Sequence, residues 1–262
     1  RRLGSVLLLV LGNPLHALNE TVHSLAWRGM IADLPRPRAI LCISAHWLTH
    51  GVAVTAMAQP KTIHDFSGFP EALHAVQYPA PGDPALAAEI AQMLAPQAVT
   101  LDAEWGLDHG TWSILTHLYP AADIPVLQLS LDVDKSPAEH FALAQKLRPL
   151  REQGVLILGS GNIVHNLGRM NWRQPDSAHD WAIRFNQRIR QHLQDGDSTA
   201  LNDLNDADAR LAVPTPEHYW PLLYIAAQQM PGDTLSIHND RIEYGSIGKL
   251  CCRIGSSPKD RA

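Results

Sequence analysis

Residues 126–159 read VLQLSLDVDKSPAEHFALAQKLRPLREQGVLILG, and this stretch decides the fold. It begins with a largely apolar run, Val126 to Leu131, and ends with another, Val155 to Gly159; both have the length of strands buried on two faces. Between them, Ser136-Pro137-Ala138-Glu139 is a capping box with proline in the first helical position, so it predicts a helix start. A strand, a helix and a second strand in this order predict a parallel pair joined by a helical crossover.

The same alternation continues on both sides of this unit. Val6 to Val10 and Ala39 to Ser44 are further buried-strand runs, and the tail has strand patterns at Thr234 to Ile237, Arg241 to Tyr244 and Lys249 to Ile254. The sequence therefore predicts an α/β fold with a mostly parallel central sheet flanked by helices and a C-terminal antiparallel portion. No linker divides the chain, so residues 1–262 are expected to form a single domain. Further helices are predicted at Glu20 to Ala32, Asp83 to Leu94, Gly110 to Leu118, His179 to Leu193 and Pro216 to Gln229.

The composition excludes several classes of protein. Hydrophobic residues make up 45% and charged residues 18% of the chain, which are values of a folded globular protein. The net charge is -5 without a basic stripe, so we expect no nucleic-acid partner, and no apolar run approaches the length of a membrane span. Cys42, Cys251 and Cys252 form neither a CxxC pair nor a disulfide framework, so we expect a cytoplasmic location and packing roles for the adjacent pair.

Histidine is the residue type that carries information about function, with 14 in the chain. In open α/β sheets, ligands bind beyond the carboxyl ends of the strands. His46 and His165 follow two predicted strands, and His218 precedes the Pro216 helix, so the three could converge. Three imidazoles with an open position suit a catalytic Zn²⁺ or Fe²⁺ site. Taken singly, each is more readily a capping or core histidine than a ligand, and only their joint placement at strand ends makes the two interpretations equal.

Two further segments could belong to such a site. His109 lies at a predicted helix start, which favours the neutral imidazole and suits a proton-transfer group or a donor to substrate; the alternative is a helix-capping turn. The loop from Thr62 to Pro70 contains His64 and Phe66 and could form the wall of an aromatic pocket, or it could be an ordinary surface loop. The GxSxG, Walker and GxGxxG motifs are absent, which weakens the serine-hydrolase, NTPase and dinucleotide-binding interpretations.

At these positions the sequence resembles the class III extradiol ring-cleavage dioxygenases, the LigB superfamily, and within it the bacterial branch related to DOPA 4,5-dioxygenase. The likeness extends over nearly the whole chain. It rests on Pro35 to Ile40, Ser44 to Trp47, Thr62 to Phe66, Phe69-Pro70, Tyr78 to Gly82, Asp108 to Trp112, Ser160 to Asn162, His165-Asn166 and Thr215 to Tyr219.

The resemblance implies an oxidoreductase that opens a catechol ring with O₂ at a mononuclear Fe(II) site, which zinc occupies in some preparations. It implies that His46 and His218 bind the metal, and that His165 is a further ligand or the acid/base, for which a pKa near the working pH is expected. His109 is expected to contact the substrate, with His64, Phe66, Trp47 and Tyr219 also expected around it. The expected partners are a small aromatic diol and O₂; the oligomeric state is left open.

One departure separates the chain from the family pattern. The family has a ligand histidine after its first strand, in His-Gly-Ser-Pro or His-Gly-Asn-Pro, and here the matching stretch is Leu11-Gly12-Asn13-Pro14. Leu11 cannot coordinate a metal, so the site would keep three histidines, or add a water or His16. Two alternatives follow: an impaired or non-catalytic zinc-binding relative, and a zinc hydrolase, although no HExxH carboxylate is present.

Overall fold

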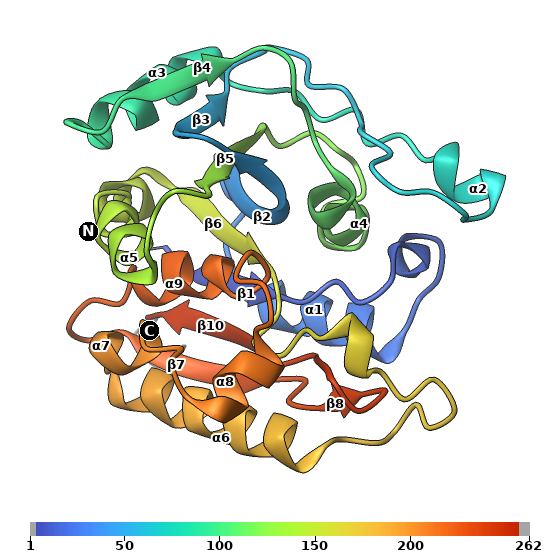
Figure 1. Cartoon of the computed structure of the whole chain (residues 1–262). Coiled ribbons are helices and arrows are strands. Elements are labelled where there is room, and N and C mark those ends of the chain that lie inside the picture. Colours follow the sequence, from blue (N-terminus) through green and yellow to red (C-terminus); the bar gives the residue numbers. More distant parts are fainter. Residues whose placement is uncertain (1–3, 257–262) are drawn as a thin grey trace.

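The computed structural model of the chain describes residues 4–256, so both ends of the predicted 1–262 unit lie outside the described residues (Figure 1). Its centre is an eight-stranded sheet with the strand order β4-β3-β5-β2-β6-β1-β10-β7. A two-stranded sheet pairs β8 (Ile242–Glu243) with β9 (Ile247–Gly248). The strands of the large sheet are β1 (Val6–Leu9), β2 (Ala39–Thr49), β3 (Val52–Thr55), β4 (Val99–Asp102), β5 (Val126–Asp132), β6 (Val155–Ser160), β7 (Thr234–His238) and β10 (Cys251–Gly255).

The central strands are parallel and one edge is antiparallel, which confirms the predicted fold class. Strand β6 pairs in parallel with β1 and β2, and β2 pairs in parallel with β5. At the C-terminal edge, β10 is antiparallel to both β1 and β7. The structure adds a further antiparallel pair, β3 with β5, at the other side of the sheet.

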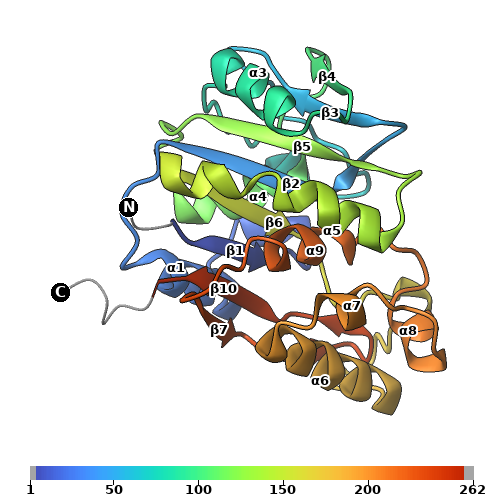
Figure 2. The ribbon, with the colours of Figure 1, turned by 90° about the vertical axis from the view of Figure 1, so that its left-hand side faces the viewer.

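Helices cover both faces of the sheet, as the two views in Figures 1 and 2 show. Helices α1 and α4 pack on one face, and α3, α5, α6 and α9 pack on the other. Within the described residues, none of the helices is both long and apolar enough to cross a membrane. The helices are α1 (Val22–Ile31), α2 (Glu71–His74), α3 (Pro84–Met93), α4 (His109–Leu118), α5 (Pro137–Gln145), α6 (Asp180–Asp195), α7 (Ser198–Leu201), α8 (Ala207–Ala212) and α9 (Trp220–Ala226), with 3₁₀ turns η1 (Pro14–Ala17), η2 (Arg148–Gln153) and η3 (Leu167–Arg169).

The two faces of the sheet have separate hydrophobic cores because successive strand residues point to opposite sides. In β2, Leu41 and Ile43 belong to the core under α3 and α5, whereas Ile40 and Cys42 belong to the core under α1 and α4. The adjacent Cys251 and Cys252 divide between the two cores in the same way and are fully buried. Their predicted packing role is therefore confirmed.

The structure corrects two predicted boundaries. Strand β2 does not end at Ser44 but continues to Thr49, and its register with β5 shifts between Ile43 and Leu48. His46 therefore lies within a strand rather than after one. Helix α9 begins at Trp220 rather than at Pro216, because the preceding residues form a turn in which Tyr219 N–H donates to the Pro216 carbonyl.

Candidate functional site

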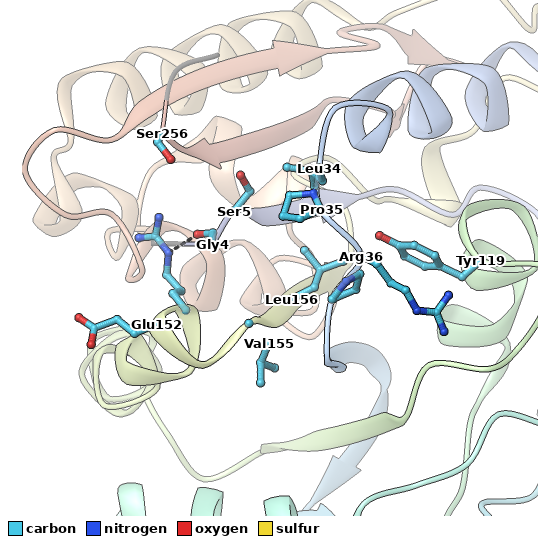
Figure 3. Close-up of a pocket in the computed structure, with 13 residues that line it drawn as sticks. Gly4, Ser5, Leu34, Pro35, Arg36, Tyr119, Glu152, Val155, Leu156 and Ser256 are labelled. Carbon is cyan, nitrogen blue, oxygen red and sulfur yellow. Dashed lines mark hydrogen bonds between the residues drawn. The ribbon is translucent and has the colours of Figure 1, made fainter. Parts of the chain in front are cut away.

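The predicted histidines lie at the edge of the sheet where the parallel strands end. At the opposite edge, where β1, β2 and β6 begin, there is a pocket of about 320 Å³ (Figure 3). Its buried Arg151 is fully engaged, because it donates to the Gly4 carbonyl and pairs with Asp233 at 2.8 Å. Ligands of open α/β sheets bind at the carboxyl ends of the strands, so the histidine edge is the candidate site.

His46 is the central member of the histidine group. Its ring centroid lies 4.1 Å from that of His109 and 5.3 Å from that of His218. Burial, followed by the neighbouring His109 and His218, lowers the pKa of His46 to about 3. A neutral imidazole with an available lone pair is the form that binds a metal.

His165 and His218 stack on one another. Their ring centroids are 3.6 Å apart and the ring planes differ by 5°. His165 is held by the loop after β6, where its N–H donates to the Ala212 carbonyl, and His218 lies in the turn before α9. The three histidines that the sequence placed together are thus in contact, with His218 touching the other two.

The acid–base properties of this pair differ from the expectation. Burial and the adjacent His218 lower the pKa of His165 to about 3, well below the near-neutral value expected for a proton-transfer group. Glu217 Oε1 lies 3.4 Å from His218 Nδ1, and this contact lowers the pKa of Glu217 to about 2. His165 is therefore neutral at neutral pH.

Asp65 is a site residue that the sequence analysis missed. Its Oδ1 accepts the N–H of His109 at 2.9 Å, and its Oδ2 lies 2.8 Å from His109 Nδ1. Burial opposes ionisation of Asp65, but the hydrogen bonds from His109 outweigh it and lower the pKa of the carboxyl group. The His64-Asp65 pair in an aromatic loop was the available signal; its partner could not be known without the fold.

The buried carboxylate of Asp108 holds the backbone segments that carry His46 and His109. Asp108 accepts hydrogen bonds from Ser44 Oγ and Gln128 Nε2, both at 2.8 Å, and the Ser44 hydroxyl in turn accepts the His46 N–H at 3.2 Å. A side chain at Gly110 would collide with Ser44 Oγ and with the His46 ring. Asp108 and Gly110 thus set the distance between β2, which carries His46, and α4, which begins with His109.

The donor set fits a divalent metal ion. Within residues 4–256, one group of three potential ligands has all its ligand atoms within 4.8 Å of one another: His46, Asp65 and His109. Two imidazoles and a carboxylate suit non-haem Fe(II), and imidazole donors also suit Zn(II). His46 belongs both to this group and to the predicted set of His46, His165 and His218.

The predicted substrate-contacting residues lie in two different environments. Phe66 packs edge-on against His109 at 5.7 Å and lies beside His64 at 6.0 Å, so both line the same aromatic region. Trp47 is buried and stacks on Trp105 at 5.7 Å. Tyr219 is fully buried, and its hydroxyl donates to the Leu201 carbonyl at 2.7 Å.

With the fold and this histidine-rich edge described, the class of protein is clear. The chain belongs to the LigB family: the model of the catalytic LigB subunit of aromatic ring-opening dioxygenase matches residues 4–254. Membership of this family supports an aromatic ring-cleaving enzyme.

Individual relatives match most of the chain. The chain is 44% identical to a 4,5-DOPA dioxygenase extradiol of Escherichia coli (strain K12), over 93% of this chain and 92% of the relative. It is 39% identical to a 4,5-DOPA dioxygenase extradiol of Beta vulgaris, over 80% of this chain and 81% of that protein. A crystal structure of an uncharacterized Escherichia coli K12 protein superposes with a TM-score of 0.85 at 40% identity, covering 96% of this chain and 100% of the other.

Proposed function

We propose that the protein is a metal-dependent extradiol dioxygenase that uses O₂ to open a catechol such as DOPA, with 4,5-type cleavage. The observation that carries the proposal is the meeting of His46, His109, His165 and His218, from four separate segments, at one edge of the sheet. The relatives named as 4,5-DOPA dioxygenases supply the substrate class. The free, buried cysteines suit a cytoplasmic location, as proposed from the sequence.

We assign the metal, iron(II) in the active form, to His46 and His218, with His165 at the metal as the acid/base or as a further ligand, and with the Asp65-His109 pair as the competing ligands. Iron(II), when bound, would bring the diol and O₂ together and pass charge from the ring to the dioxygen. Variants separate the two ligand sets. Loss of metal in His218→Ala but not in Asp65→Asn supports the three histidines, and the reverse result supports the carboxylate set.

The proposed roles of the protein groups follow from their surroundings. As the acid/base, with its lone pair free of the metal, neutral His165 accepts the proton of the substrate hydroxyl; because burial lowers its pKa, this transfer needs the negative charge of the resulting diol anion beside it. His109, oriented by the Asp65 carboxylate, holds the developing oxyanion. Phe66 and His64 exclude water along the aromatic side of the site.

The test of this assignment is His165→Ala. Formation of the yellow ring-opened product from DOPA should fall by roughly 100-fold or more, the usual contribution of a proton-transfer group. Folding should be retained, as judged by circular dichroism. His50→Ala, at an exposed histidine paired with Asp134, is the control and should keep full activity. Undiminished product formation by His165→Ala contradicts the role.

A second candidate function, an impaired zinc-binding relative, is favoured by one observation. Leu11, at the family's ligand position, is half-buried against the core under α1 and α4, where it supplies no donor atom. If this candidate is correct, the parent protein contains zinc and shows no catechol-dependent oxygen uptake, and Leu11→His gains ring cleavage. Full activity of the parent protein with iron(II) would exclude it.

A further inference from the structure

Lys249 is a buried cation at the same edge of the sheet as the histidines. It lies between β9 and β10, and its residue surface is only 3% exposed. The antiparallel register of β1 with β10 pairs Leu8 with Cys252, and continuing it brings Lys249 alongside Leu11 and Gly12. The Lys249 side chain extends to Gly12, because a Cβ added at Gly12 would overlap Lys249 Nζ.

The ammonium group lies beside the His16 ring, since both are close to the position of a Cβ added at Gly12. The positive charge of Lys249 contributes, after burial, to the lowered pKa of His16. Burial lowers the pKa of the Lys249 ammonium, and the Glu243 carboxylate opposes this shift.

The backbone just before Lys249 adjoins the loop that carries His165, because the Gly248 N–H donates to the Val164 carbonyl and His165 forms a bridge with Ile247. Lys249 thus borders the loop that carries His165, on the side of β1.

The ammonium is incompletely paired. Within the described part of the chain, its ion-pair partner is Glu243, whose Oε2 is 3.8 Å from Nζ, longer than an ordinary hydrogen bond. The other oxygen of Glu243 is 2.8 Å from His23 Nε2. An ammonium group has three donors, and a buried charge is costly unless they are used. Gly12 is exposed and has no side chain, so the nitrogen lies in the space beside it, next to the His16 ring.

We propose that Lys249 Nζ is an anion-binding group of this site, which binds the carboxylate of an acidic catechol and selects it over neutral catechols. The inference rests on the proposed function, because it names the substrate class of the same site. The lysine and the diol-binding histidines would hold the two ends of one small molecule.

The experiment is anaerobic titration calorimetry of the zinc-loaded protein, in which no turnover competes with binding. The probes are 3,4-dihydroxybenzoate and 4-methylcatechol, which differ in the carboxylate. The parent should prefer the acid, and Lys249→Met should reduce this preference by roughly tenfold or more, the usual effect of losing a charge-assisted hydrogen bond. Lys249→Arg should retain most of the preference. Lys146→Met removes a charge far from the site, where Nζ donates to the Ala95 carbonyl, and should keep the parent ratio.

The variant Glu243→Gln distinguishes anion binding from a merely structural ion pair, because the preference for the acid should change in the opposite direction to that in Lys249→Met. Glu243→Gln removes the competing carboxylate while its amide oxygen can still accept from His23, so the preference for the acid should increase. A structural role would instead lower the affinity for both probes in Lys249→Met and Glu243→Gln alike. An unchanged ratio in Lys249→Met overturns the proposal; if that variant does not fold, an unchanged ratio in Glu243→Gln overturns it.

If the proposed function is wrong, the binding results differ from those expected when only the anion site is wrong. If 4-methylcatechol and the acid both fail to bind the parent, the diol site is wrong, and benzoate then tests the lysine alone. Benzoate binding that is weakened in Lys249→Met and strengthened in Glu243→Gln still supports the anion site. No benzoate binding by the parent overturns it.

Discussion

At the scale of single residues, the site depends on groups that touch no substrate in the proposed reaction. Asp108 is the clearest case, since one fully buried carboxylate accepts from Ser44 on β2, from Gln128 on β5 and from the indole of Trp105. Burial, followed by the nearby Asp65, raises the pKa of Asp108, and the hydrogen bonds oppose that rise. We assign Asp108 a positioning role for His46.

Asp108→Ala should therefore affect both stability and metal binding. Two buried donors, on Ser44 and Gln128, and the half-buried indole of Trp105 lose their acceptor, so the free energy of unfolding should fall by about 3 kcal/mol in urea titrations. Metal affinity should fall as well, because the Ser44 hydroxyl that holds the His46 backbone is released. Asp176→Ala, at an exposed position, is the matched control. A variant as stable as the parent would show that Asp108 does not organise this region.

At the scale of elements, the unit at residues 126–159 was predictable because local signals agreed. The predicted capping box is formed at the start of α5: Ser136 Oγ accepts the Glu139 N–H, and the Glu139 carboxylate accepts the Ser136 N–H. Strands β3 and β4 were not predicted, since β4 is a four-residue, partly exposed strand without a strong apolar run. The continuation of β2 through His46 was missed because the apolar pattern ends before the strand does.

The capping box gives a test at this scale. Ser136→Ala removes the acceptor for the Glu139 N–H, so the free energy of unfolding should fall by about 1 kcal/mol. Thermal unfolding followed by circular dichroism measures the change. Ser67→Ala, in an exposed loop, should leave the midpoint unchanged. A midpoint for Ser136→Ala equal to that of the parent would mean that the cap contributes nothing.

At the scale of the whole molecule, the sequence predicted which histidines meet but not the charges around them. His46, His165 and His218 could be selected because each lies near a strand end or helix start. The pairing of Asp65 with His109 and the approach of Lys249 to Gly12 depend on loops and strand register that no local pattern determines. The ligand set and the substrate contacts stay predictions.

Stability of the whole molecule should depend on pH through a histidine outside the site. Burial lowers the pKa of His140 from 6.5 to about 4, and its Nδ1 contacts the Tyr224 hydroxyl at 2.8 Å. The unfolded chain binds the proton more readily, so the contribution is fully present above about pH 6.5 and is lost as the pH falls toward about 4. His140 alone should cost about 2 kcal/mol between about pH 7.5 and about pH 5.

The measurement is urea unfolding at both pH values, for the parent and for His140→Gln. The variant should lose less stability on acidification than the parent does. His50→Gln, on the exposed surface, should not flatten the dependence. Equal acid sensitivity in the parent and His140→Gln would show that another group is responsible.

The central claim is that histidines from distant parts of the chain hold one catalytic metal at the carboxyl edge of the sheet. Oxygen uptake on adding a catechol to protein loaded anaerobically with iron(II) tests it most directly. The account predicts one O₂ consumed per catechol opened by the parent, and none above background by the His46→Ala, His218→Ala double variant. Uptake by that variant equal to the parent's would contradict it.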